Sequence, residues 1–313
     1  MTILITGGAG FIGSHLTQLH LERGDDVYVI DNLITGSLRN LETVANHPHF
    51  QCINADITQY DFSSLPSFDT IYHLASPASP IQYKKYPVET LLCNSFGTYR
   101  LLEFMKSSGS KRFLFTSTSE IYGDPLVHPQ PESYWGNVNT LGPRACYDES
   151  KRFGEAICST YVRKYNLDVR MARLFNTYGP NMEKNDGRVV SNFIVQALEQ
   201  KPITIYGDGT QTRSFCYVSD TVDGIYKLAT TEGLKGEVIN IGNPDERTMI
   251  ELATIIKKIT LSSSEIVFQE LDADDPKKRK PDIAHAKAKL GWEPKVALSE
   301  GLTATISYFK TLI

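Results

Sequence analysis

Cysteine is scarce in this sequence, and the few cysteines present form no recognisable site. There are five among 313 residues, an odd number, and no two of them stand in a Cys-x-x-Cys pair. A disulfide framework needs an even set, and structural zinc sites use closely spaced pairs. The seven histidines make no ligand cluster either. We therefore expect reduced thiols and no metal.

Long apolar runs and blocks of one charge are also missing. No run approaches the roughly 20 apolar residues of a membrane span. The first predicted strand begins at Thr2, which leaves no room for a signal peptide. The net charge is −4, and the only basic block, Lys277–Lys280, gives no electrostatic footprint for nucleic acid. The sequence predicts a cytoplasmic protein that binds neither membranes nor nucleic acid.

A glycine-rich turn follows the first predicted strand. Residues Thr2–Thr6 are β-branched or aliphatic, as in a buried parallel strand. The sequence Gly-Gly-Ala-Gly-Phe-Ile-Gly occupies 7–13, and a helical pattern begins near Ser14. Glycines at such a turn let the backbone approach a pyrophosphate at the helix N-terminus. This arrangement predicts a dinucleotide site.

An acidic residue follows the second predicted strand. Asp26–Ile30 leads into Asp31, eighteen residues after Gly13. A carboxylate at this place accepts hydrogen bonds from the adenosine ribose and repels a 2′-phosphate. The sequence thus favours NAD over NADP as cofactor.

Strands and helices continue to alternate through the first half of the chain. Helical patterns at Thr90–Ser107 and Tyr147–Tyr165 separate some of four further apolar segments, Phe50–Asn54, Thr70–Leu74, Arg112–Thr116 and Asp168–Ala172. The alternation predicts an α/β fold with a doubly wound parallel Rossmann sheet. Ligands bind such sheets at the carboxyl ends of the strands. One crevice should therefore be bordered by Gly7, Asp31, Asp56, Leu74–Ser76 and Thr116–Glu120.

The second half predicts a smaller lobe. After about residue 175 the sequence reads as loops and shorter elements, whereas Val218–Ala229 reads as a helix that returns to the main sheet. We expect a NAD-binding domain over 1–175, with a returning segment near 216–242. Residues 176–313 should form mainly a substrate-binding lobe, interleaved with the first domain.

Tyr147 and Lys151 stand four residues apart on a predicted helix. At that spacing the phenol and the ammonium project from the same face. A nearby cation favours phenolate, so the tyrosine could act as a base near neutral pH. Tyr-x-x-x-Lys is also common on helix surfaces, and only its context distinguishes the two interpretations.

Longer stretches supply that context. They are HLASPASP (73–80), TSTSEIYGDP (116–125), GPRACYDESKR (142–152), FNTYGP (175–180), NDGRVVSNF (185–193), YGDGTQTRSF (206–215), GNP (242–244) and RKPDI (279–283). With them the sequence resembles the extended short-chain dehydrogenase/reductase family over nearly the whole chain, and within it the UDP-glucuronate decarboxylases. The resemblance implies conversion of UDP-glucuronate to UDP-xylose and CO2 through a 4-keto intermediate, with NADH recycled in the site. Some relatives carry a membrane anchor ahead of the first strand, and we expect neither such an anchor nor a luminal location for this chain.

The resemblance also assigns roles to individual residues. Thr118, Tyr147 and Lys151 would oxidise carbon 4 of the sugar, with the tyrosine taking the hydroxyl proton. The resulting ketone is β to the carboxylate at carbon 6, so CO2 can leave and the enolate is stabilised by Tyr147 and Lys151. Protonation at carbon 5 and return of the hydride complete the cycle.

Ser119 and Glu120 distinguish the decarboxylases from their relatives. An Asp-Glu pair occupies these positions in nucleotide-sugar 4,6-dehydratases, and small uncharged residues do so in 4-epimerases. We expect Ser119 to bond near the substrate carboxylate, and Glu120 to orient a water or help deliver the carbon 5 proton. Glu120 could instead only hold a neighbour.

Arg279 corresponds by resemblance to an arginine that reaches the sugar carboxylate, although composition alone would place it in a solvated loop. Candidates for cofactor or UDP contacts are Arg188, Arg213, Asn176 and Tyr206. The expected substrate-binding set combines three of them with the arginine above and consists of Asn176, Tyr206, Arg213 and Arg279. The expected cofactor set comprises Gly7, Gly10, Phe11, Ile12, Asp31, Asn32, Thr35, Gly36, Asp56, Ile57, Leu74, Ser76, Tyr147, Lys151, Thr177 and Arg188.

Alternative functions remain. A dehydratase or epimerase acting on another nucleotide sugar is the nearest one, and a non-catalytic NAD-binding regulator is more distant because Thr118, Tyr147 and Lys151 are all present. In relatives the helices matching Thr90–Ser107 and Tyr147–Tyr165 pack against their copies as a four-helix bundle. The resemblance therefore implies a homodimer.

Overall fold

The computed structural model describes residues 1–270 and 278–313. Lys277, the first residue of the short basic block, lies outside this part. Within it a seven-stranded sheet has the order β11-β6-β5-β4-β1-β2-β3, and every neighbouring pair is parallel. The strands of this sheet are β1 (Thr2–Thr6), β2 (Asp26–Asp31), β3 (Phe50–Asn54), β4 (Thr70–His73), β5 (Arg112–Thr118), β6 (Asp168–Leu174) and β11 (Val238–Ile241).

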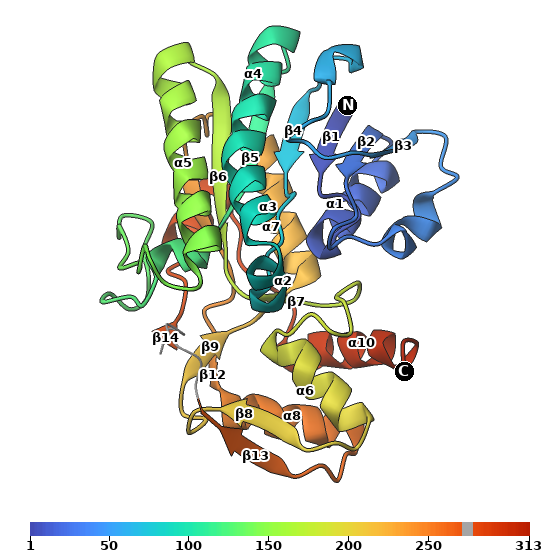
Figure 1. Ribbon diagram of the computed structural model, residues 1–313, viewed down its shortest axis with the longest axis vertical. Helices are drawn as coiled ribbons and strands as arrows, with labels where there is room; N and C mark the ends of the chain where they lie inside the picture. Colours follow the sequence, from blue (N-terminus) through green and yellow to red (C-terminus); the bar gives the residue numbers. More distant parts are fainter. Residues whose placement is uncertain (271–277) are drawn as a thin grey trace.

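Helices cover both faces of this sheet (Figure 1). One face carries α1 (Phe11–Glu22), α7 (Val218–Thr230) and α9 (Ala284–Leu290). The other carries α3 (Pro87–Leu92), a π-helical turn η3 (Cys93–Gly97), α4 (Thr98–Ser108) and α5 (Ala145–Tyr165). The predicted α/β fold with a doubly wound parallel sheet is confirmed.

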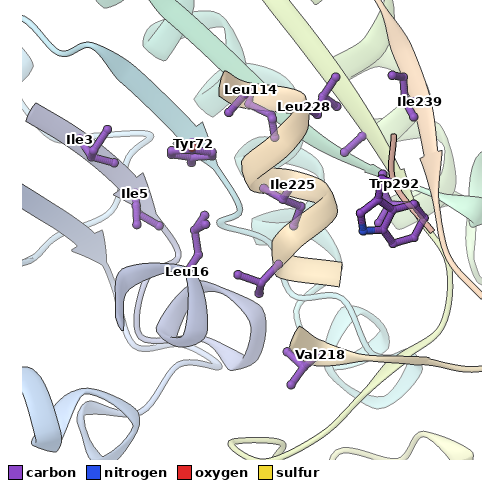
Figure 2. Close-up of a cluster of buried hydrophobic side chains, with 14 of the residues drawn as sticks. Ile3, Ile5, Leu16, Tyr72, Leu114, Val218, Ile225, Leu228, Ile239 and Trp292 are labelled. Carbon is purple, nitrogen blue, oxygen red and sulfur yellow. The ribbon is translucent and has the colours of Figure 1, made fainter. Parts of the chain in front are cut away.

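Alternate residues of each buried strand pack into two separate hydrophobic cores, one on each face of the sheet. Ile3 and Ile5 of β1 point to the side of α1 and α7, where they join Leu16, Ile225 and other fully buried side chains (Figure 2). Leu4, between them, belongs to the core under α4 and α5. Side chains of a strand alternate between faces, so a strand covered on both sides is apolar throughout.

The C-terminal part forms a lobe with its own core. Helices α6 (Val189–Leu198), α8 (Met249–Thr260) and α10 (Leu298–Lys310) pack with the parallel pair β8 (Ile203–Tyr206) and β13 (Ile266–Gln269). The remaining strands are β7 (Thr177–Tyr178) paired with β10 (Cys216–Tyr217), and a small sheet of β12 (Glu246–Thr248), β9 (Thr212–Ser214) and β14 (Lys278–Arg279). Short helical segments are η1 (Leu38–Val44), η2 (Phe62–Ser64), α2 (Pro80–Lys85) and η4 (Ser119–Tyr122).

Several predicted boundaries and elements need correction. Helix α1 begins at Phe11 and not near Ser14, because Gly10 already accepts from the Ser14 amide at 3.0 Å. The predicted single helix Thr90–Ser107 is α3, η3 and α4 in succession. The expectation of loops and shorter elements after residue 175 is wrong for α6, α8 and α10, which have 10 to 13 residues each.

The described residues contain neither a membrane-spanning helix nor a cluster of metal-binding side chains. No helix there combines the length and the apolar character that a membrane crossing requires. The same residues hold no group of three or more His, Cys, Asp or Glu side chains suited to a metal ion.

Candidate active site

The carboxyl ends of the parallel strands open into a cavity of about 540 Å³. Each sequence-predicted site residue lines it: the cofactor set from Gly7 to Arg188, the substrate set, and Thr118, Ser119 and Glu120. The structure therefore brings together residues that span the chain from the first strand to β14.

The glycine turn forms one end of the cavity. Gly7 has φ of +76°, and a Cβ there would lie 2.6 Å from the amide nitrogen of Ala75. A Cβ on Gly13 would lie 2.1 Å from the carbonyl oxygen of Gly7. Side chains are thus excluded where β1 passes into α1, and Gly10 caps the helix without a side-chain hydrogen bond. The bare helix N-terminus fits a pyrophosphate group.

Asp31 lies at the end of β2 on the same side of the cavity. Its carboxylate accepts hydrogen bonds from the amides of Ala9 at 3.0 Å and Leu33 at 2.9 Å. Burial raises the pKa of Asp31, and the two amides oppose that shift. Each carboxylate oxygen accepts one of these bonds and can accept another, so the residue fits the ribose hydroxyls of a dinucleotide.

Tyr147 and Lys151 occupy the first turns of α5, and both are buried. The Lys151 ammonium donates to the carbonyl of Thr116 at 2.7 Å and lies 5.9 Å from the centre of the Tyr147 ring. Burial lowers the pKa of Lys151 to about 8. Burial also raises the pKa of Tyr147, which outweighs the hydrogen bond with Thr118. Burial therefore works against the phenolate that the sequence predicts near neutral pH.

A second tyrosine packs against the first. The ring of Tyr83, from α2, stacks on Tyr147 with centroids 5.2 Å apart and planes 8° from parallel. The hydroxyl of Tyr83 is buried and has no hydrogen-bond partner in the described part of the chain. Tyr83 therefore fixes one side of the Tyr147 ring, a contact that the sequence did not predict.

Glu120 is the centre of a buried ionic cluster. It follows β5 in η4, and its carboxylate pairs with Arg279, whose Nη2 lies 2.9 Å from Oε2 and whose Nη1 contacts Oε1. Arg144 also donates to Oε2. Burial alone would raise the pKa of Glu120, but the two guanidinium groups hold it well below its usual range. Glu120 is therefore ionised at neutral pH, and Arg279 is already engaged.

The neighbours of Glu120 in η4 are also fixed. Thr118 ends β5, and its hydroxyl accepts from the Glu120 amide at 3.2 Å. Ser119 is buried beside it. These three residues therefore turn sharply where β5 meets the cavity.

Arg279 owes its position to the strand β14. That strand pairs with β9, and Gln130 binds the following residue from the other side. The amide of Lys280 donates to the side chain of Gln130, and the amide of Gln130 donates to the carbonyl of Lys280, both at 2.9 Å. The arginine expected from composition to be solvated is thus only 5% exposed.

The remaining predicted arginines lie at the boundary between the sheet and the C-terminal lobe. Arg188 pairs with Asp186, Nη2 to Oδ1 at 3.0 Å, and its guanidinium lies over the Phe11 ring. Arg213 is buried and donates to the carbonyl of Thr212 at 2.9 Å. Asn176, Thr177 and Tyr206 also line the cavity between the two parts.

Arg144 was missed by the sequence-based prediction. It stands three residues before Tyr147, within GPRACYDESKR, and nothing in its spacing indicates a carboxylate partner. Its contact with Glu120 depends on the loop that separates β5 from α5. An available clue was the position of a cationic side chain so close to the predicted base.

Comparisons with known proteins agree with this geometry. Residues 3–242 match the family described as "NAD dependent epimerase/dehydratase family". UDP-glucuronic acid decarboxylase 3 of Arabidopsis thaliana is 55% identical, over 96% of this chain and 87% of the relative. UDP-glucuronic acid decarboxylase 1 of Xenopus tropicalis is 51% identical, over 98% of this chain and 72% of the relative. The crystal structure of UDP-glucuronic acid 4-epimerase from Bacillus cereus, in complex with UDP-glucuronic acid and NAD, has a TM-score of 0.92 and 34% identity, and all of both chains is covered. The chain belongs to the NAD dependent epimerase/dehydratase family.

Proposed function

We propose that this protein is an NAD-dependent UDP-glucuronate decarboxylase, which forms UDP-xylose and CO2. One observation carries the proposal: a buried cluster of Arg279, Arg144 and Glu120 borders the same cavity as Thr118, Tyr147 and Lys151. A sugar that is oxidised at carbon 4 by the second group would have its carboxylate within reach of the first. Relatives named as decarboxylases, at 50 to 55% identity, support this choice.

The oxidation step uses Thr118, Tyr147 and Lys151. Bound NAD supplies the hydride acceptor for carbon 4 and later returns the hydride. The Thr118 hydroxyl positions the sugar 4-hydroxyl beside Tyr147, and the tyrosine oxygen receives its proton. Lys151, anchored by the Thr116 carbonyl, holds positive charge below a pKa of about 8 and stabilises the phenolate.

The decarboxylation step uses the ionic cluster. Arg279 binds the sugar carboxylate, and the 4-keto group accepts the electron pair that is left when the bond from carbon 5 to carbon 6 breaks. The protonated Tyr147, whose pKa burial raises, then donates a hydrogen bond to the enolate oxygen. Ser119 hydrogen-bonds near the carboxylate, and the ionised Glu120 orients a water that gives a proton to carbon 5. The hydroxide that remains takes a proton from bulk solvent, which accounts for the one proton consumed when CO2 is lost.

Epimerisation of the same sugar is the second candidate, because the Bacillus cereus structure of nearly the same fold is a UDP-glucuronic acid 4-epimerase. Both reactions begin with oxidation at carbon 4. They differ in whether the carboxylate is lost, so the products separate them.

An assay of products tests the proposal. The protein is incubated with NAD and UDP-glucuronate, and separately with UDP-glucose, while released CO2 and UDP-xylose are measured. We expect both products from UDP-glucuronate alone. Epimerised UDP-hexuronate without CO2 would contradict the proposal.

A tyrosine variant tests the proposed proton acceptor. Tyr147→Phe should lower turnover by at least about a hundredfold, as expected for loss of a general base. Tyr165→Phe, at the far end of α5, is the matched control and should keep wild-type turnover. A Tyr147→Phe protein with near-normal turnover would exclude the tyrosine as the base.

We also propose a homodimer formed through one helical face. Exposed apolar side chains gather on α3, η3, α4 and α5, namely Val88, Leu91, Leu92, Phe96, Tyr99 and Phe153. Monomeric proteins rarely expose apolar patches of this kind, and an apolar helical face suits a second copy. The cytoplasmic location stays a prediction, and cell fractionation would test it.

A further inference from the structure

Two guanidinium groups share one carboxylate at the end of β5. Arg279 contacts Glu120 through both of its terminal nitrogens, and Arg144 contacts Oε2 as well. The three side chains are 5%, 11% and 14% exposed for Arg279, Arg144 and Glu120. With two positive charges and one negative charge, this set carries a formal charge of +1. One more carboxylate would balance it.

The two arginines come from different parts of the fold. Arg144 directly precedes α5, and Glu120 follows β5, so their pair joins neighbouring elements of the main sheet layer. Arg279 lies on β14 in the small sheet formed with β9 and β12. Its Nε is buried without a hydrogen-bond partner in the described residues. Arg279 thus retains an unused donor, as a residue that exchanges partners would.

We propose that Arg144 is a positioning residue that keeps Glu120 in place while Arg279 binds the carboxylate of the substrate. This inference rests on the proposed function. When the substrate enters, each guanidinium has one carboxylate. Without Arg144, Glu120 would compete for Arg279, and once displaced it would remain buried without a cation, which is unfavourable for an ionised group.

Other groups near Glu120 do not replace Arg144. Besides the two arginines, the titratable groups that interact electrostatically with Glu120 include the Asp148 carboxyl and the phenols of Tyr83 and Tyr147. None of them is a cation. Loss of Arg144 should therefore favour the protonated form of Glu120 whenever Arg279 is occupied.

The test compares Arg144→Met with Arg144→Lys in the NAD-loaded protein. The pH dependence of kcat for CO2 release is measured from pH 5 to 9, and affinities for UDP-glucuronate and UDP-xylose are measured by calorimetry. For Arg144→Met we expect the acid limb to move up by about 1–3 pH units, the size of shift that a close opposite charge produces. Affinity for UDP-glucuronate should fall about tenfold, and affinity for UDP-xylose, which lacks the carboxylate, should not. Arg144→Lys should restore most of both properties.

Three controls separate positioning from general damage. Arg163→Met, on the exposed end of α5, should leave both readouts at wild-type values. In a Glu120→Gln background, adding Arg144→Met should not shift the acid limb of the pH profile beyond its position in Glu120→Gln alone. The shift should also persist in an Asp148→Asn background, because Asp148 is the other carboxyl nearby.

Clear results would overturn the inference. The first is a folded Arg144→Met protein whose acid limb in the pH profile of kcat and whose affinities equal those of the wild type. The second is a shift of the acid limb that disappears in the Asp148→Asn background. The third is a loss of kcat without any change in the pH profile. If Arg144→Met fails to fold, Arg144→Gln takes its place with the same expectations. A wild-type protein that releases no CO2 from UDP-glucuronate would instead contradict the proposed function.

Discussion

Burial shifts the pKa of several titratable side chains around this cavity. It raises the pKa of Tyr147, Asp148 and Tyr83 and lowers that of Lys151, so each shift favours the neutral form. Glu120 differs because two guanidinium groups compensate its desolvation. Glu120 therefore keeps its negative charge at neutral pH, whereas burial favours the neutral form of its neighbours Tyr147 and Asp148.

Asp148 offers a pH-dependent test of this balance. Its Oδ1 is buried without a partner in the described residues, and burial, followed by the charge of Glu120, raises its pKa to about 7. Between about pH 4 and pH 7 the folded state binds the proton that the unfolded chain has lost. Stability from this group therefore falls as pH rises through that window.

Asp148→Asn should remove this pH dependence. Relative to the wild type, we expect the variant to gain free energy of unfolding from pH 5 to pH 8, on the order of a few kcal/mol. Urea unfolding at both pH values measures it, with Glu42→Gln, an exposed carboxyl, as control. An equal effect of Asp148→Asn at the two pH values would show that Asp148 titrates normally.

At the scale of residues, the sequence predicted side chains that stand at strand ends and missed those defined by distant partners. Asp31 and Thr118 lie at the carboxyl ends of apolar strands, so their place at the cavity could be inferred. Arg144 and Glu120 are 24 residues apart, and Arg279 and Glu120 are 159 apart. These contacts depend on loop paths and on β14, which local patterns do not encode.

Helix α5 packs directly on strand β5 and carries Tyr147 and Lys151 to the cavity. The close approach requires Gly154, where a Cβ would lie 2.3 Å from Cζ of the buried Phe115 ring. Gly154→Ala should lower the free energy of unfolding by about 1–3 kcal/mol through overpacking. It should also reduce kcat, because α5 carries the proposed base.

Denaturant unfolding and product assays of Gly154→Ala test this expectation. The matched control is Ala156→Ser, which adds one atom on the exposed side of the same helix. Helix propensity alone would make Gly154→Ala stabilising by about 1 kcal/mol. A more stable variant would mean that Phe115 moves aside without cost.

At the scale of elements, six strands of the main sheet were predicted, and their ends lie within two residues of the observed ones. Short apolar segments followed by turn residues made these six recognisable, whereas β11 and the strands of the C-terminal lobe were not predicted. The turn η3 interrupts a helical pattern because Asn94 is drawn inward and donates to Ser76 at 3.0 Å and Ser150 at 3.1 Å. Periodicity does not reveal such a bond. Helix α8 had a readable signal, the capping box of Thr248 and Glu251, which the prediction did not use.

At the scale of the whole molecule, the exposed apolar face on α3, η3, α4 and α5 is the proposed dimer interface. Charge substitutions on this face test the proposed dimer. Phe96→Glu with Phe153→Glu should convert a dimer into a monomer at micromolar concentration, because each copy would bring glutamates to an apolar interface. Sedimentation velocity measures the state. Phe268→Glu, an exposed phenylalanine on β13, is the control. A wild-type monomer would exclude the proposed assembly.

Because Arg279 comes late in the sequence, it is synthesised after Glu120 and Arg144. All seven strands of the main sheet lie within residues 2–241, and Glu120 and Arg144 fall in the same part of the sequence. Since synthesis proceeds from the N-terminus and early segments can fold first, this sheet can form before β14 leaves the ribosome. Glu120 then meets Arg144 first and Arg279 later. A nascent chain therefore has a stable partner for its buried carboxylate before the substrate-binding arginine exists in folded form.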